Sequence, residues 1–554
     1  MKVTRRDWLV WGAGATAGVV LSPVPWKLLG DTSIWTQNWP WIPQPARGPL
    51  EVKASACTLC PNGCGLRVRM AGGWPVGLAG LRSHPVSQGA LCPLGFGAHQ
   101  LIWHPARLRA VRHRGGASSW DEARAAFVKA CSEGPVGIVD GFPGRAASSV
   151  FESFAQKRNG AYRAVLGPES QALTPYEAWT RVPARNLGFD LENARTIVSF
   201  GAPLLDGWGT PGRFSHLWAE RAAGQSDPQL RLIHVETSLS TTGSRAWRRI
   251  VIRPGSEAAL ASGIARVLIE DKLVPARGPM PLLTLSQAAE QSGISADAIR
   301  ELAHTMVASQ PVIAIANDDN PAIAALNVIL GAVGSRGGIV QRSKPKHSTI
   351  STADLRDMRA VLIDSSMPWE FVPETRAEVF RFAAWDGGPT RADWLLPTPA
   401  LLEDLTDMPT APASAIETYA IAAPLVAPPT GTLSAAQFLA EIDPAAAPVE
   451  KIIRARCDEL LRGRAGTVHA QESTPVTNIA TAEKLEEQLR NGGVWVGEPP
   501  RAAALRCDLK EWPAERPSKP SARSSAWAAP VLPPLATKLY EESNLLQPVP
   551  RRNS

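Results

Sequence analysis

The chain has 554 residues, enough for about three domains of ordinary size and a large core. Hydrophobic residues make up 44% and charged residues 20%, which excludes a fibrous chain and a largely disordered one. The net charge of +7 comes without a dense Lys/Arg tract or an aromatic–basic alternation, so the sequence gives little support to nucleic-acid binding.

The N-terminus has the pattern of an export signal. Arg5 and Arg6 precede a Gly/Ala-rich apolar run from Val10 to Leu21, and paired arginines before a short, weakly apolar segment are typical of twin-arginine signals. The run is shorter than a membrane-spanning helix, which needs about 20 residues. We therefore expect a signal that is either cleaved or kept as an anchor. The body should lie on the periplasmic, extracytoplasmic face of the cytoplasmic membrane.

Four of the seven cysteines form a cluster in the sequence, Cys57-x2-Cys60-x3-Cys64-x27-Cys92. Three thiolates on a turn-rich loop and a distant fourth match the four Cys ligands of a [4Fe–4S] cluster. Structural zinc also takes four Cys, usually as two separated pairs, and an empty or disulfide-bonded site is a third alternative. The spacing favours one [4Fe–4S] cluster. The remaining cysteines are expected to be small buried hydrophobic residues: Cys131, Cys457 and Cys507.

The body of the chain alternates amphipathic helices with short apolar runs. Helices are predicted at 121–132, 147–156, 258–270 and 295–309. Strands are predicted at 136–139, 196–200, 230–235 and 312–316. Alternation of this kind favours βαβ units around mainly parallel sheets.

The cysteine region carries a family resemblance. The CxxCxxxC motif is followed by a predicted hairpin, GLRVRMAGGWPVGLAG, then HPVSQGALCPLG, then an ordered tail of His104-Pro105, Arg107, Arg114-Gly115 and Trp120–Ala123. In these features the chain resembles the iron–sulfur domain of the molybdopterin oxidoreductase family, the complex iron–sulfur molybdoenzymes. Four later segments extend the resemblance, which covers most of the chain from Cys57 to about Asp443: ENARTIVSFGAPLLD, IHVETSLSTTGSRAWRRIVIRPGSEAALASGIARVLIED, AALNVILGAVGSRGG and ADWLLPTPALLEDLTD. The second of these segments resembles the family's second nucleotide-binding strand.

The resemblance implies an α/β fold, with a small N-terminal iron–sulfur domain followed by doubly wound αβα domains. We expect the family's C-terminal β-barrel to be missing, because the last region is short and rich in Pro, Ser and Ala. The expected division is a signal or anchor at 1–30, a Trp/Pro-rich linker at 31–50, a [4Fe–4S] domain at 51–115, central α/β domains at 116–460, and a truncated C-terminal region and tail at 461–554.

Departures from the family pattern bear on the cofactor. Members that bind molybdenum or tungsten supply a ligand from a loop after the first central strands. The comparable stretch here, 167–186, has no Cys, and Ser170, Thr174 and Asp190 in or near it form no ligand motif. A position that is often Lys or Arg in the family is Leu94 here.

The turn after the second nucleotide strand also departs, because it has lost its basic residue. Glu236 in that turn could still accept hydrogen bonds from a ribose or guanine. We expect one cluster and no molybdenum. A retained molybdopterin dinucleotide stays open as the alternative.

Other polar residues receive no catalytic or binding role. Three histidines near the cysteines are expected to be hydrogen-bonded loop residues, because four thiolates already complete a cube: His84, His99 and His104. Four acids are expected to be solvated loop charges, because no spacing marks them: Asp364, Asp386, Glu403 and Asp404.

A retained central fold without a molybdenum ligand resembles the molybdopterin-binding-like subunits of menaquinone reductase and alternative complex III. It implies an extracytoplasmic subunit of a membrane-bound (mena)quinone oxidoreductase, in electron transfer or as a scaffold. An iron–sulfur subunit, a multihaem cytochrome c and an integral quinone-binding subunit would be its partners. The alternatives are a catalytic molybdenum or tungsten bis-pterin oxidoreductase acting on a small substrate, and a module whose metal only braces the fold. Whether the chain is itself an enzyme stays open.

Overall fold

The computed structural model describes residues 4–21, 48–104, 106–205, 208–209, 211–225, 228–275, 280–342, 354–365, 375–385, 392–499 and 505–513. Most of the Trp/Pro-rich linker, Asp386, and the tail after residue 513 lie outside these residues. The expected signal region forms helix α1 (Arg5–Leu21). Within the described ranges, no helix combines the length and the apolar character that crossing a membrane requires.

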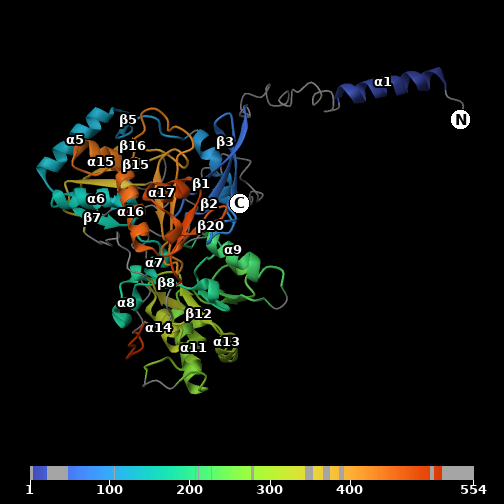
Figure 1. The fold of residues 1–554 in the computed structure, drawn as a ribbon. Coiled ribbons are helices and arrows are strands. Elements are labelled where there is room, and N and C mark those ends of the chain that lie inside the picture. The colour runs from blue at the N-terminus through green and yellow to red at the C-terminus, as the bar shows by residue number, and fades with distance from the viewer. Residues whose placement is uncertain are drawn as a thin grey trace.

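The cysteine region forms a small antiparallel sheet with strand order β1-β2-β3 (Figure 1). The predicted hairpin is confirmed as β2 and β3. Side chains alternate along β2, so that Leu66, Val68 and Met70 are buried while Arg67 and Arg69 are exposed. The elements are β1 (Leu50–Ala56), β2 (Gly65–Ala71), β3 (Trp74–Gly80), α4 (Pro93–Gly97) and the 3₁₀ helix η1 (Ala98–Trp103).

A seven-stranded sheet follows, with order β5-β4-β16-β15-β14-β6-β7. Its strands from β16 to β7 are parallel, as the alternation of strands and helices predicts. The hairpin β4–β5 pairs with β16, so the expected domain boundary at residue 115 falls inside this sheet. The strands are β4 (Arg112–His113), β5 (Gly116–Ala117), β6 (Val136–Asp140), β7 (Ala161–Ala164), β14 (Ala360–Asp364), β15 (Glu378–Ala383) and β16 (Trp394–Pro397).

Helices cover this sheet through a cluster of aromatic rings. Phe127 of α5 (Trp120–Glu133) lies 6.1 Å from Phe154 of α6 (Ala146–Lys157) and 5.6 Å from Phe438 of α15 (Ala435–Ile442), measured between ring centroids. The ring of Phe380 on β15 is 5.0 Å away. These helices therefore pack on one face of the sheet. On the other face, Val361 and Ile363 form a second apolar cluster.

Between β7 and β14 the chain builds a second α/β domain around a parallel sheet of order β11-β10-β9-β12. The core includes both Ile197 and Val198, whose side chains point to opposite faces, so both faces of this sheet are covered. The predicted strands 196–200 and 312–316 coincide with β9 and β12. The strands are β9 (Thr196–Phe200), β10 (Arg231–Glu236), β11 (Arg248–Val251) and β12 (Val312–Ala316), with β8 (Leu187–Phe189) and β13 (Ile339–Gln341) as a separate pair.

The helices of this domain include the two that the sequence predicts there. Residues 258–270 and 295–309 correspond to α11 and α13. The full set is α7 (Pro168–Gln171), α8 (Pro175–Thr180), α9 (Pro211–Arg221), α10 (Thr241–Ser244), α11 (Glu257–Glu270), α12 (Leu285–Ser292), α13 (Ala296–Ala308) and α14 (Pro321–Ile329), with the 3₁₀ turns η2 (Ala184–Asn186) and η3 (Leu191–Asn193).

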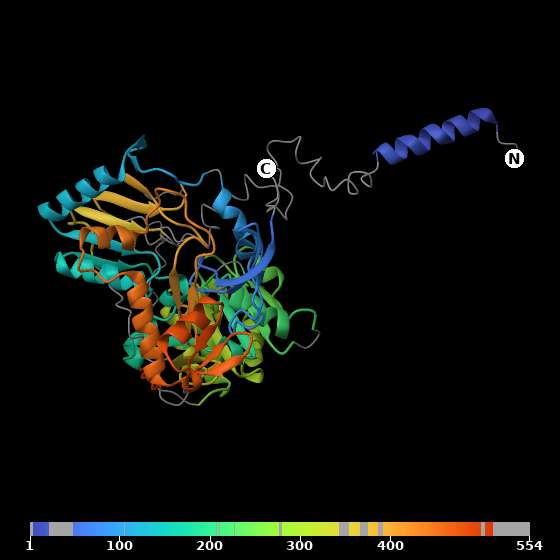
Figure 2. The same ribbon diagram turned by 45° about the horizontal axis from the view of Figure 1, so that its top comes forward.

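A five-stranded antiparallel sheet of order β17-β18-β21-β19-β20 completes the described body. The expected boundary at residue 460 falls within α16, and strands on both sides of it share this sheet. Figure 2 shows this unit, in orange to red, beside both the blue three-stranded sheet and the green domain. The elements are β17 (Thr406–Pro409), β18 (Thr418–Ala422), α16 (Val449–Gly463), β19 (Thr467–His469), β20 (Ser473–Pro475), η4 (Val476–Asn478), α17 (Ala482–Arg490) and β21 (Val494–Val496).

Candidate functional site

Three of the four clustered cysteines lie on the loop between β1 and β2. The Cys57 N–H donates to the Cys64 carbonyl at 2.8 Å, which ties the two ends of the loop together. Gly63 has φ of +59°, a conformation that other residues rarely adopt, and supplies the turn. The fourth, Cys92, begins α4, where its Sγ accepts a hydrogen bond from the Gly95 N–H at 3.4 Å.

The structure brings the four thiols together. Burial raises the pKa of Cys57, and the charges of Cys64 and Cys92 raise it further. For Cys60, burial raises the pKa most, and the charges of the other three thiols raise it further. For Cys64, burial and then the charge of Cys92 raise the pKa to about 12. Four thiolates this close repel one another unless cations lie between them. Metal binding at this site must therefore release protons.

The four-thiol donor set is the one that a [4Fe–4S] cluster requires. Among the described residues, no three His, Cys, Asp or Glu side chains converge closely enough to hold one metal ion. In a [4Fe–4S] cube each thiolate binds a different iron, so the sulfur atoms surround a larger object. The residues present fit such a cluster.

Two residues that the sequence analysis missed contact the thiols. Asn62 donates from Nδ2 to the Cys64 Sγ at 2.6 Å, and hydrogen bonds to sulfur tune the potential of iron–sulfur sites. A Cβ at Gly212, in the first turn of α9, would lie 2.7 Å from the same sulfur. Only glycine lets α9 approach the cysteine loop this closely. Asn62 stands inside the motif, but no local signal links position 212 to Cys64.

Two of the three nearby histidines, His84 and His104, are hydrogen-bonded loop residues, as the sequence predicts. The Val86 and Ser87 N–H groups donate to Nδ1 of His84 at 3.3 and 3.1 Å. Burial lowers the pKa of His84 to about 4, so the ring is neutral. His104 accepts from the Ala106 N–H at 3.1 Å. His99 instead lies within η1, where burial lowers the pKa of its ring.

The prediction of solvated loop acids is wrong for Asp364 and Glu403. Asp364 is buried at the end of β14 and pairs with Arg145. Glu403 pairs with Arg107, and their side chains are 3% and 0% exposed. Both acids can be buried because arginines far away in the sequence lie beside them and provide the compensating positive charge. Burial also raises the pKa of Asp404 to about 6.

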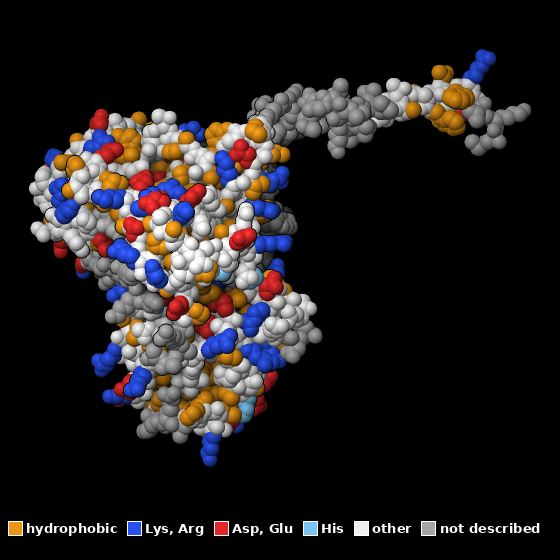
Figure 3. Space-filling view, in the orientation of Figure 1, with side chains coloured by type: hydrophobic (Ala, Val, Ile, Leu, Met, Phe, Trp, Pro, Cys, Tyr) orange, Lys and Arg blue, Asp and Glu red, His pale blue; other side chains and the backbone are white. Residues whose placement is uncertain are grey.

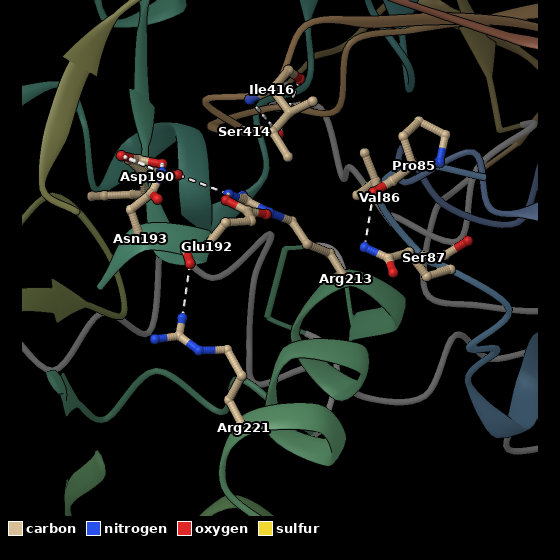
Figure 4. A network of polar contacts seen from close by, with 12 residues as sticks. Pro85, Val86, Ser87, Asp190, Glu192, Asn193, Arg213, Arg221, Ser414 and Ile416 are labelled. Atoms are coloured by element: carbon tan, nitrogen blue, oxygen red, sulfur yellow. Dashed lines mark hydrogen bonds and ion pairs between the residues drawn. The ribbon is translucent and has the colours of Figure 1, made fainter. Parts of the chain in front are cut away.

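The stretch that matches the family's metal-ligand loop forms no ligand cluster. Asp190 is buried and accepts hydrogen bonds from the Gly337 N–H and from Asn193 Nδ2, both at 2.8 Å. Figure 4 shows it turned toward Asn193, while Arg213 and Arg221 of α9 reach Glu192. Asp190 thus holds a loop in place. Ser170 and Thr174 instead border a cavity of 890 Å³.

This cavity does not fit a molybdopterin dinucleotide. Its four arginines face four glutamates, so the lining offers no net positive charge to a ligand with several phosphates. Arg342 already donates to the carbonyls of Ala411 and Ser414 at 3.3 and 3.2 Å. The charged residues of the lining are Glu177, Arg181, Arg185, Arg342, Glu417, Arg456, Glu459 and Glu498.

Glu236, the expected acceptor for a ribose or guanine, is also occupied. Its carboxylate accepts from the Ser240 N–H at 3.1 Å and from the Ser240 hydroxyl at 2.6 Å, and it pairs with Arg249. A Cβ at Gly243 would lie 2.0 Å from the Glu236 Oε1, so no space remains on that side. Residues of this chain therefore already occupy the carboxylate of Glu236.

Glu169 is a buried acid that the sequence analysis missed. It lies in the metal-ligand stretch and is 2% exposed, and neither carboxylate oxygen has a hydrogen-bond partner in the described part of the chain. A cavity of 10 Å³ beside it is lined mainly by apolar residues such as Phe189 and Trp208. That volume is at the lower limit for one water. Burial raises the pKa of Glu169 to about 7.

Replacing Glu169 with Gln should stabilise the protein at alkaline pH. Folding raises the pKa of Glu169 from near 4.5 to about 7, so the folded state holds the proton that the unfolded chain releases between these pH values. The protein therefore has its full stability below pH 4.5 and loses stability as the pH rises to 7. At pH 8 the wild type should therefore be less stable than the variant by up to about 3 kcal/mol. At pH 4, below the ordinary pKa, the two should agree within a few tenths of a kcal/mol. Thermal midpoints at both pH values measure this. The exposed Glu290→Gln is the control, and an equal shift in both variants would contradict the assignment.

Comparisons with known proteins agree with this geometry. Residues 50–104 match the family described as the molybdopterin oxidoreductase Fe4S4 domain. The menaquinone reductase molybdopterin-binding-like subunit of Nitratidesulfovibrio vulgaris is 30% identical over 395 residues, which are 67% of this chain and 56% of that protein. The major subunit of the nitrate-inducible formate dehydrogenase of Escherichia coli is 26% identical over 50% of this chain and 30% of its own length.

A solved structure extends the likeness to most of the fold. Acetylene hydratase from Pelobacter acetylenicus superposes with a TM-score of 0.57 at 13% identity, covering 80% of this chain and 74% of that one. This likeness shows the fold alone. Together, the cysteine loop, the two parallel-sheet domains and the sequence identity show that the chain belongs to the molybdopterin oxidoreductase family.

Proposed function

We propose that this chain is an electron-transfer subunit of a membrane-bound quinone oxidoreductase complex. Cys57, Cys60, Cys64 and Cys92 hold one [4Fe–4S] cluster, and the chain binds no molybdenum. The observation that carries the proposal is the convergence of these four thiols in a fold where residues of this chain already occupy the carboxylate of Glu236. When bound, the cluster supplies one-electron transfer.

The protein's own residues set the conditions for that transfer. Cys57 and Cys64 are buried in an apolar cluster with Leu66 and Met70, which keeps water from the sulfur atoms. Asn62 and the Gly95 N–H donate to sulfur and stabilise negative charge there. No residue of the chain is assigned a catalytic role, since the cavity near Ser170 lacks a charge pattern for the family's cofactor.

The setting of the chain is part of the same proposal. The paired arginines at the start of α1 direct export of the folded chain, and the body acts outside the cytoplasmic membrane. The similarity to a menaquinone reductase subunit supports a multi-subunit complex. Its other members are an iron–sulfur subunit, a multihaem cytochrome c and an integral quinone-binding subunit.

Metal analysis of the complex purified from native membranes tests the proposal. We expect this chain to contribute about four iron atoms, since a cube holds four, beyond those of the haem and iron–sulfur partners, and we expect no molybdenum, tungsten or pterin. Electron paramagnetic resonance of the reduced sample should show one cluster that disappears when this chain is deleted. Stoichiometric molybdenum or tungsten with pterin would establish the catalytic alternative instead. One zinc per chain would overturn both.

A second experiment tests the proposed location outside the cytoplasmic membrane. Protease added to intact spheroplasts should cleave the chain.

A further inference from the structure

A cavity of 80 Å³ lies between the cysteine loop and the edge of the seven-stranded sheet. Thr58 and Leu59, which stand between Cys57 and Cys60, form one part of its lining. The carboxyl end of the parallel strands forms another part, through Asp364 at the end of β14. The cavity therefore joins the surroundings of the cysteine ligands to ionisable groups at the edge of the sheet.

The lining of this cavity suits water. The indole N–H of Trp385 borders it and has no hydrogen-bond partner in the described part of the chain. A buried donor without a partner costs free energy, and a bridging water removes that cost where the space is polar and large enough. One water needs about 10–15 Å³, so the cavity has room for several. Among the described lining residues, Arg145 is the one cation.

Asp404 lines the same cavity and has no ion-pair partner among the described residues. Its carboxylate accepts a hydrogen bond from the Leu405 N–H at 2.9 Å. Leu402, two residues earlier, packs in the same apolar cluster as Cys57 and Cys64, which fixes this loop against the cysteines. Asp404 is partly exposed, so protons from solvent can reach it.

Charged groups from three other elements act on Asp404. Burial is the largest cause that raises its pKa, to about 6, and the charges of Glu450 and Asp364 also raise it. Arg145 lowers the pKa, but this guanidinium already pairs with both Asp140 and Asp364. A further negative charge nearby therefore shifts Asp404 toward its protonated form at neutral pH.

The other charges around the cavity are balanced. Arg107 pairs with Glu403, and Arg456 pairs with Asp407. Figure 3 shows acidic and basic side chains mixed on the surface where Figure 1 labels α16 and α17, and Glu450 is an exposed acid in the first turn of α16. An electron that arrives at the cysteine loop would therefore be the main change of charge near Asp404.

We propose that Asp404 binds a proton when the cluster at the cysteines takes up an electron, and releases it when the electron leaves. The proposal rests on the proposed function, because only a redox centre at the cysteines changes charge there. The electron comes from a one-electron carrier of the haem or iron–sulfur class, which is oxidised. A proton from solvent water forms an O–H bond with one carboxylate oxygen of Asp404. One negative and one positive charge arrive together, so the net charge of the site is unchanged.

The pH dependence of the cluster's midpoint potential measures this coupling. If reduction raises the pKa of Asp404, protonation of Asp404 must favour reduction by the same factor. Two unit charges about 10 Å apart, at an effective dielectric constant of about 20, change an equilibrium constant about tenfold. The potential should therefore fall by about 59 mV, the one-electron equivalent of a tenfold change, as the pH rises from 5 to 9 and Asp404 ionises.

Redox titration of the complex purified from native membranes, followed by electron paramagnetic resonance, tests the assignment. The wild type should show this fall. Asp404→Asn should stay near the wild-type value of pH 5 at every pH, because the amide is neutral in both redox states. Glu450→Gln should keep the fall but move it to lower pH, since loss of that charge lowers the pKa of Asp404. Glu169→Gln, which changes a buried acid at a different cavity, is the matched control and should behave as the wild type.

The outcomes separate this inference from the proposed function. A wild-type potential that is constant between pH 5 and 9 overturns the inference and leaves the cluster in place. A fall that Asp404→Asn retains, or that Glu169→Gln loses, does the same. If Asp404→Asn loses its iron, Glu450→Gln decides: movement of the fall to lower pH supports the inference, and an unmoved fall overturns it. Absence of iron from the wild type overturns the proposed function first, and this inference with it.

Discussion

Replacing Cys64 with Ser should reduce the iron content of the purified chain from about four atoms to background, because a [4Fe–4S] cube needs all four thiolates. Ser is nearly isosteric with Cys, but its hydroxyl is a far weaker iron ligand and stays protonated at neutral pH. Cys64 is also the ligand that accepts from Asn62 and lies against Gly212, so the change falls where the β1–β2 loop meets α9. Absorbance near the cluster bands and iron analysis measure the effect.

The matched control for this experiment is Cys457→Ser. Cys457 is fully buried in a different apolar cluster, so its replacement tests the general cost of placing a hydroxyl in the core. It should leave iron unchanged. If Cys64→Ser kept its cluster while folding normally, the ligand assignment would fail. Because binding of a metal centre contributes to folding, we also expect faster proteolysis of residues 48–115 in the Cys64 variant alone.

The parts of the fold that sequence predicts best are those with strong local patterns. The strands 196–200 and 312–316 are short, fully buried apolar runs, and their ends coincide with β9 and β12. The cysteine spacing predicts a shared site for four thiols, and the fold places these four near one another. The five-stranded sheet was missed, because its strands have three to five residues and show too little alternation to be recognised.

Contacts between residues far apart in sequence account for the failures at the site. Gly212 meets Cys64 across 148 positions, and nothing near either residue announces the other. Glu403 stands in a loop sequence that is typical of solvated acids, but Arg107, 296 positions away, lies against it in the fold. Arg107 and Glu403 both belong to segments that carry the family resemblance. Their pairing gives those motifs a structural meaning that the sequence alone did not.

Replacing Glu403 with Gln should lower the free energy of unfolding by about 3–5 kcal/mol, since it leaves the buried charge of Arg107 without a counter-charge. The Arg107 guanidinium also donates to the Thr398 carbonyl at 3.2 Å and lies 5.3 Å from the ring centre of Trp385, so it cannot turn to solvent without breaking other contacts. The shift in the urea or thermal midpoint measures the loss. Glu301→Gln is the control, because its pair with Arg248 is exposed and such pairs contribute less than about 1 kcal/mol.

Removing both charges should cost less than removing one. Burial lowers the pKa of Arg107 and raises the pKa of Glu403, so each group is shifted toward its neutral form despite the nearby opposite charge. Burial therefore outweighs the attraction, and the pair itself adds little to stability. We expect Arg107→Met with Glu403→Leu to be more stable than Glu403→Gln, and clearly less destabilised than the sum of the two single changes. If the double variant lost as much as that sum, the two side chains would be acting independently, and the ion pair would not be what joins the iron–sulfur domain to the loop at Glu403.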